Sequence, residues 1–280
     1  MLSFLFAPIL ASAVLGATLD TRQSIWQPAV GAKVQIVLSN VVTSGTPSDA
    51  NIFVIDLFDT PVSTISNLKS GGKKVICYFS AGTSENWRPD YKSFTATDQG
   101  DALKDWEGEN YVNLKSANVV KIMKARIQKA KNAGCNGVDL DNVDAYTTDD
   151  GGGFGLTQAD SVTFMRTMAK SASSLGLSIG LKNAPDILPQ VSDVIQWAIN
   201  EACKAYDECA LYDTFLKTKP VFHIEYATHS DMTTIASVRS AYCQEDTASK
   251  RFSTIIKTRA LDGWVMYCDG SAVVTPANSG

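Results

Sequence analysis

Eight short apolar runs, separated by amphipathic stretches, are the feature of this sequence that most limits its fold. The runs are rich in Val and Ile and almost continuously apolar, which is typical of parallel strands buried on both faces. They cover residues 34–39, 51–57, 73–80, 136–142, 177–183, 194–201, 221–227 and 263–269. The sequence therefore predicts eight strands.

The stretches between the runs carry helix signals. Residues 116–133 have apolar side chains at spacings of three and four, and Gly134 follows where a helix C-cap belongs. Residues 157–175 open with Thr157 and Asp160, the spacing of a capping box, and stop before Gly176. Further helices are expected at 62–70, 204–217, 231–244 and 248–259.

Alternating strands and helices predict a parallel sheet, and eight strands in one unit predict a single-domain (β/α)8 TIM-type barrel. The chain of 280 residues has no linker, repeat or charge run that would divide it. The connection over residues 40–50 has no helix pattern, so the first βα unit is expected to be irregular. Because no helix is expected after the last run either, an open doubly wound sheet is the alternative.

The N-terminus has the character of a secretory leader. Residues 2–17 carry no charge, and small residues offer cleavage sites after Ala13, Gly16 or Ala17. We expect a signal peptide over 1–17, a mature barrel domain over 18–280, and an extracellular protein. No later apolar run approaches the ~18 residues of a membrane span, so no membrane association is expected after cleavage.

The charge balance restricts the partners. The formal net charge is −4, whereas nucleic-acid binding usually needs a basic face. A neutral or cationic partner fits better, and we expect a monomer without nucleic-acid partners.

Six cysteines fit an oxidising compartment. Six cysteines allow 15 connectivities, and the sequence does not choose among them. Closeness along the chain favours Cys203 with Cys209 and Cys243 with Cys268. That would leave Cys77 with Cys135.

Carboxylates fall at the ends of two expected strands. In a barrel, side chains alternate between the two faces of a strand, and chemistry takes place at the C-terminal strand ends. Asp139 and Asp141 share one face of the fourth strand, and Glu225 ends the seventh with His223 beneath it. Because burying unpaired acids is costly, we expect Asp141 and Glu225 to meet at the barrel mouth.

Other polar and aromatic residues would complete a sugar-binding cleft. Hydrogen-bonding side chains end further strands, and exposed indole rings suit the apolar faces of pyranose rings. The expected substrate-binding residues are Asp139, Tyr78, Asp56, Lys182, Asn183, Glu201, Trp87 and Trp264, with Trp106 as a further platform.

Competing interpretations are weaker. An aspartate at a strand end often only caps the next turn, and the Asp139, Asp141 and Asp144 cluster lacks the EF-hand pattern. Ser178 sits in a G-x-S-x-G match, but a helix precedes it and a strand follows, the reverse of a nucleophile elbow. Without nucleotide-binding or zinc motifs, we expect no cofactor and no metal.

Four segments resemble glycoside hydrolase family 114, the endo-α-1,4-polygalactosaminidases and spherulin-4-like secreted proteins. They are KVICYFSAGTSENWRPD (74–90), GVDLDNVDAY (137–146), NEACKAYDEC (200–209) and KPVFHIEY (219–226). The resemblance covers residues 26–269 and implies a TIM-type barrel, secretion, and cleavage inside α-1,4-linked galactosamine-containing polysaccharide such as galactosaminogalactan.

The resemblance also implies roles for single residues. The catalytic acids of the family map onto Asp141 and Glu225, and its motif tyrosine maps onto Tyr78. A retaining mechanism would use Asp141 as nucleophile and Glu225 as acid and base. The alternatives are a non-catalytic carbohydrate-binding or storage barrel and a hydrolase of another α-linked polysaccharide.

Overall fold

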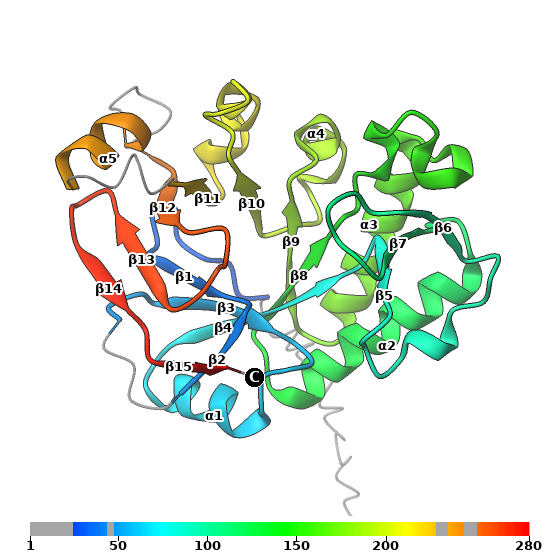
Figure 1. Ribbon diagram of the computed structural model, residues 1–280, viewed down its shortest axis with the longest axis horizontal. Coiled ribbons are helices and arrows are strands. Elements are labelled where there is room, and N and C mark those ends of the chain that lie inside the picture. Colours follow the sequence, from blue (N-terminus) through cyan, green and yellow to red (C-terminus); the bar gives the residue numbers. More distant parts are fainter. Residues whose placement is uncertain (1–24, 44–47, 228–234, 244–250, 280) are drawn as a thin grey trace, which may run out of the picture.

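A computed structural model describes residues 25–43, 48–227, 235–243 and 251–279 of this chain. Its central sheet starts with eight parallel strands in barrel order and curls around an apolar interior (Figure 1). These strands are β1 (Val34–Val37), β3 (Ile52–Asp56), β4 (Lys74–Ser80), β8 (Gly137–Asp141), β9 (Ser178–Lys182), β10 (Trp197–Glu201), β11 (Val221–Tyr226) and β12 (Ser253–Lys257). The predicted α/β TIM-type fold is confirmed.

The helices lie around the outside of the sheet (Figure 1). They are α1 (Val62–Ser70), α2 (Ala117–Ala133), α3 (Gln158–Ser174), the short α4 (Leu188–Val191) and α5 (Ile235–Tyr242). Ser116 caps α2, Gly134 ends it in the left-handed conformation, and Thr157 and Asp160 form the capping box predicted for α3. No helix lies between β1 and β3 in the described residues 38–43 and 48–51, as expected for an irregular first unit.

Two expected helices are wrong. Residues 204–217 contain only the 3-10 turns Cys209–Tyr212 and Phe215–Lys217. Within 248–259 the chain forms β12, the eighth parallel strand. Residues 244–250 lie outside the described ranges. The β-branched run of Thr254, Ile255 and Ile256 suits a strand better than a helix.

The expected eighth strand at 263–269 is also corrected. It forms β13 (Trp264–Tyr267), which pairs antiparallel with β12, and β14 (Ala272–Val274) continues the sheet. At the seam, Lys257 Nζ on β12 donates to Gln35 Oε1 on β1 over 3.2 Å. Side-chain contacts thus join the two ends of the eight-stranded run.

Five further short strands complete the described fold. Near the two ends of the described part, β2 (Asn40–Val42) and β15 (Ala277–Ser279) pair with each other as antiparallel strands. Between β4 and α2, β5 (Thr83–Glu85), β6 (Gln99–Ala102) and β7 (Glu109–Val112) form a separate three-stranded sheet. This sheet lies beside the C-terminal end of β4.

The register of the ladder defines which side chains face the barrel interior. Trp197 on β10 stands beside Gly180 on β9, and Gly137 on β8 stands beside Ser178, two residues before Gly180. A Cβ on Gly180 would lie 1.9 Å from the Trp197 indole nitrogen, and one on Gly137 2.4 Å from its ring. The two glycines therefore make room for Trp197 inside the barrel, and residues of the same parity on these strands face inward.

All three favoured disulfides are confirmed. Cys77 bonds Cys135, Cys203 bonds Cys209, and Cys243 bonds Cys268. The expected signal peptide over residues 1–17 lies outside the described residues. Within the described ranges no helix has both the length and the apolar character needed to cross a bilayer.

Candidate active site

Asp141 ends β8 on its inward face and is held by three donors. The Tyr78 hydroxyl and Lys182 Nζ donate to its Oδ2 over 2.8 and 2.9 Å, and the Asn142 backbone N–H donates to Oδ1 over 2.8 Å. Its side chain is 11% exposed. These contacts fix the orientation of the Asp141 carboxyl group at the barrel mouth, with limited access to solvent.

Lys182 links Asp141 to a second carboxylate. Its Nζ also lies 2.6 Å from Oε2 of Glu201, which ends β10 with a side chain 21% exposed. Because the lysine contacts lie 2.9 and 2.6 Å away, the two bridged oxygens are at most about 5.5 Å apart. Retaining glycosidases place their two carboxyl groups about 5–5.5 Å apart.

Glu201 is oriented by further hydrogen bonds from its neighbours. Asn183 Nδ2 donates to Glu201 Oε2 over 3.1 Å, and the Asn183 side-chain oxygen accepts the Glu201 N–H over 2.9 Å. Asn183 itself adopts a left-handed conformation with φ of 52°, which asparagine tolerates better than most residues. The Tyr226 hydroxyl donates to the other oxygen, Oε1.

The buried lysine dominates the electrostatics of this pair. Burial alone would lower the pKa of Lys182, but the charges of Asp141 and Glu201 raise it well above its ordinary value. Burial likewise opposes the ionised form of Glu201, yet Lys182 and the donors around it bring the pKa of Glu201 down to about 2. Glu201 is therefore ionised in the free protein at neutral pH.

Asp139 behaves in the opposite way. It lies one layer below Asp141 on the inward face of β8, is 1% exposed, and its Oδ1 has no hydrogen-bond partner. Burial raises its pKa to about 8, against the lowering effect of Lys182 and with help from the charges of Asp141 and Glu201. Asp139 therefore carries a proton at neutral pH.

The three-stranded sheet adds one more perturbed acid. Glu109 on β7 is 5% exposed, and burial together with the charges of Glu85 and Asp141 raises its pKa to about 7. Burial and Asp141 also raise the pKa of Asp144, in the turn that follows β8. The cleft thus gathers several acids around one lysine, an arrangement that favours cationic ligands.

The structure does not bring Glu225 together with Asp141. In the β10–β11 register Glu201 stands beside Ile224, and Asn200 stands beside His223. Neighbours in a parallel ladder share a face, so Glu225 and His223 lie on the outward face, opposite to the face that carries Glu201. The Glu225 side chain is 1% exposed, and its Oε1 contacts His223 Nε2 at 2.7 Å and the Lys204 backbone N–H at 2.9 Å.

The remaining predicted residues lie farther out or serve neighbouring side chains. Asp56 Oδ2 forms an ion pair with Arg88 at 2.6 Å, and its Oδ1 caps the following turn at Phe58. Trp87 is 50% exposed, and Trp106 is 61% exposed. Trp264 lies on β13, outside the eight parallel strands.

Sequence reasoning missed Tyr226 and Glu109. Tyr226 directly follows Glu225 in the I-E-Y motif, and its opposite parity is what directs the hydroxyl to Glu201. Glu109 lies outside the eight strands, so no strand-end rule could find it. The spacing of Glu85 and Glu109, which pair across β5 and β7, would have been the available signal.

One group of potential metal ligands is found in the described ranges, at Cys203, Cys209 and His223. The two sulfur atoms are joined in a disulfide. They therefore offer no thiolates to a metal ion in this state.

A TIM-type barrel with two carboxylates close together at its C-terminal mouth defines the class of barrel glycoside hydrolases. The model of glycoside-hydrolase family GH114 matches residues 16–273. This chain belongs to that family and is a glycoside hydrolase. A search of the curated proteins finds no match.

Solved structures agree with this assignment. The crystal structure of Aspergillus fumigatus Ega3 in complex with galactosamine is 48% identical, covers 87% of this chain and 97% of its own, and superposes with a TM-score of 0.81. The glycoside hydrolase domain of PelA from Pseudomonas aeruginosa is 14% identical, with coverages of 82% and 96% and a TM-score of 0.60. At that identity PelA supports the fold alone.

Proposed function

We propose that this protein is a secreted, endo-acting hydrolase of α-1,4-linked galactosamine-containing polysaccharide, with Asp141 and Glu201 as its catalytic carboxyl pair. The observation that carries the choice of residues is the lysine bridge, which keeps the two bridged oxygens within about 5.5 Å. That separation supports a retaining, two-step mechanism.

Asp141 is suited to the role of nucleophile. Tyr78, Lys182 and the Asn142 N–H donate to its oxygens and hold them oriented. In the first step its oxygen bonds to the anomeric carbon and the glycosidic bond breaks. Water then cleaves the glycosyl ester and regenerates the carboxylate.

Glu201 is suited to the role of acid and then base, because its side chain is the more exposed of the two. To protonate the leaving oxygen it must first bind a proton. A bound sugar excludes water from the cleft, and this desolvation acts in the direction that raises the pKa of Glu201. In the second step the same carboxylate accepts a proton from the attacking water.

The charge of the cleft supports a substrate with free amino groups. Asp141 and Glu201 both pair with Lys182, the charge of Asp141 reaches Glu109, and the whole chain has a net charge of −4. Ega3, the relative at 48% identity, was crystallised with galactosamine. The exposed rings of Trp87 and Trp106 offer stacking surfaces for sugar units farther along the polymer.

Three disulfides and an uncharged N-terminal run support secretion, and we propose that the protein acts as an extracellular monomer.

The test is incubation with purified galactosaminogalactan, followed by mass spectrometry of the products. We expect short oligosaccharides containing galactosamine from early time points, the sign of internal cleavage. A fully N-acetylated preparation of the same polymer should be cut more slowly. Binding without cleavage would support a carbohydrate-binding barrel, and cleavage of only another α-linked polysaccharide would overturn the substrate.

A further inference from the structure

The loop that follows Glu201 is closed on itself. After Ala202, which has a left-handed φ of 61°, the Cys203–Cys209 disulfide joins residues six apart. The Glu208 N–H donates to the Cys203 carbonyl over 2.8 Å, and Cys203 is fully buried. Glu201 therefore ends its strand directly beside a rigid ring of seven residues.

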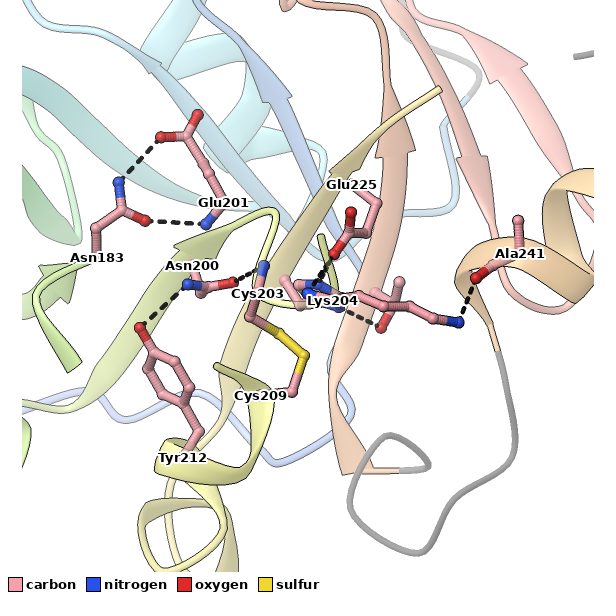
Figure 2. The surroundings of a disulfide bond; sticks show 11 residues. Asn183, Asn200, Glu201, Cys203, Lys204, Cys209, Tyr212, Glu225 and Ala241 are labelled. Atoms are coloured by element: carbon pink, nitrogen blue, oxygen red, sulfur yellow. Dashed lines mark hydrogen bonds and ion pairs between the residues drawn. A yellow bond between two sulfur atoms is a disulfide. The ribbon is translucent and has the colours of Figure 1, made fainter. Parts of the chain in front are cut away.

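This ring is fastened to the outer face of the barrel at two consecutive amides. The Cys203 N–H donates to Asn200 Oδ1 over 2.9 Å, and the Lys204 N–H donates to Glu225 Oε1 over 2.9 Å. Both acceptors come from outward-facing positions of β10 and β11 (Figure 2). The ring is thus held on the face opposite to the one that carries Glu201.

Glu225 is itself held in place. His223 Nε2 lies 2.7 Å from Glu225 Oε1, and His223 Nδ1 lies 3.1 Å from Thr254 Oγ1 on β12. The His223 ring packs at 5.2 Å from that of Phe252. A buried carboxyl group held by these neighbours is suited to anchor a backbone amide. At 1% exposure, the Glu225 side chain has no accessible surface for contact with a sugar.

We infer that Glu225 is a positioning residue, which fixes the disulfide ring through the Lys204 amide and so sets the place of the Glu201 carboxyl. This inference rests on the proposed role of Glu201. Lys204 is only three residues beyond Glu201, so a shift of the ring moves the end of β10. A shift of about 1 Å at a reacting group is enough to cost about 100-fold in rate.

The activity test compares two substitutions at one position. In Glu225→Gln the amide oxygen still accepts the Lys204 N–H, whereas Glu225→Ala removes the acceptor. We expect Glu225→Gln to keep kcat within about threefold of wild type, and Glu225→Ala to lose about 10- to 100-fold in kcat with KM within about threefold. Glu201→Gln is the control for loss of a catalytic carboxyl.

Hydrogen exchange of the Lys204 amide is the readout that does not depend on activity. In the full chain, this amide should exchange at least about tenfold faster in Glu225→Ala than in wild type, and at the wild-type rate in Glu225→Gln. If the wild type cleaves no galactosamine polymer, the proposed substrate fails while the exchange result still tests the anchor.

Two results would overturn the inference. One is a Glu225→Gln variant as inactive as Glu201→Gln, which would make Glu225 a catalytic residue. The other is a folded Glu225→Ala variant with wild-type kcat or wild-type exchange at Lys204.

Discussion

The ends of β10 and β11 each carry a glutamate, and the two differ in the face of the barrel that they occupy. Glu201 faces inward, shares Lys182 with Asp141 and keeps a side chain 21% exposed. Glu225 faces outward, binds a backbone amide and a histidine, and is 1% exposed. The two residues lie at similar levels on neighbouring strands, yet only Glu201 contacts the group that orients Asp141.

A position at a strand end determines where along the barrel axis a side chain lies. It does not determine whether the side chain faces the barrel interior or the outside. Along one strand, alternation tells which residues share a face. Which of the two faces points inward depends on the neighbouring strands and on what fills the barrel. On β10, the Trp197 side chain packs against Gly180 inside the barrel, so Trp197 and Glu201 face inward. The β10–β11 register then places Ile224 on the inward face and Glu225 on the outward face.

Neutralising each acid in turn gives the strongest test of the difference between Glu201 and Glu225. Glu201→Gln and Asp141→Asn should each lower kcat by about 10³-fold or more, because each removes a carboxyl that reacts in the proposed mechanism. Glu225→Gln is the matched control at the other face and should stay within about threefold. Initial rates of reducing-end release from the polymer measure all three.

Equal losses of kcat in Glu201→Gln and Glu225→Gln would show that the face of the strand does not determine which glutamate is catalytic.

Removing the shared cation should have the next largest effect. Lys182→Met keeps the length of the side chain but leaves Asp141 and Glu201 with no positive charge between them. Because Lys182 lowers the pKa values of Glu201 and Asp139, its loss should raise both. Because Glu201 must be protonated to act as the acid, we expect the basic limb of the kcat/KM profile to move to higher pH, with about a 100-fold loss at the optimum from the lost orientation of Asp141.

The control for this substitution is Lys219→Met, which removes a lysine two residues before β11 that hydrogen-bonds to the carbonyls of Ser192 and Ile195. That variant should leave the position of the basic limb unchanged. An unshifted limb in Lys182→Met would contradict the bridge as the source of the low pKa.

A final expected effect concerns stability and not rate. Because the folded pKa of Asp139, about 8, lies above the ordinary 3.8, its contribution to stability is fully present below about pH 4. It is lost as pH rises toward 8, up to about 5 kcal/mol. Asp139→Asn, neutral at every pH, should therefore be more stable than wild type at pH 8, and the difference should shrink toward pH 5.

Denaturant unfolding of both proteins at several pH values measures this difference. A gap between the two proteins that stays constant from pH 5 to pH 8 would mean that Asp139 does not titrate in this range.

Much of the fold follows from local patterns in the sequence. Apolar runs predicted seven of the eight parallel strands, and capping residues such as Thr157 and Gly134 indicated ends of the long helices α2 and α3. The sequence pattern predicts a helix over the β12 segment, because the periodicity of a short apolar run does not distinguish a strand from a helix. The eighth strand could be recognised only from its pairing with β11.

The candidate site was predicted in part. Asp141, Lys182, Asn183 and Glu201 were expected at strand ends, and the structure places them in one hydrogen-bonded group. The partner of Asp141 was not predictable in the same way, because the choice between Glu201 and Glu225 depends on register between strands. The catalytic role first expected for Glu225 stays a prediction that the substitutions above can test.

The separation of Asp141 and Glu201 is the central claim, and the stereochemistry of the product tests it most directly. Proton NMR during the first minutes of hydrolysis reports the anomeric form of the new reducing ends before mutarotation mixes them. With carboxyl oxygens within about 5.5 Å, the account predicts that the α-anomer appears first. First appearance of the β-anomer would show inversion and would contradict the pair.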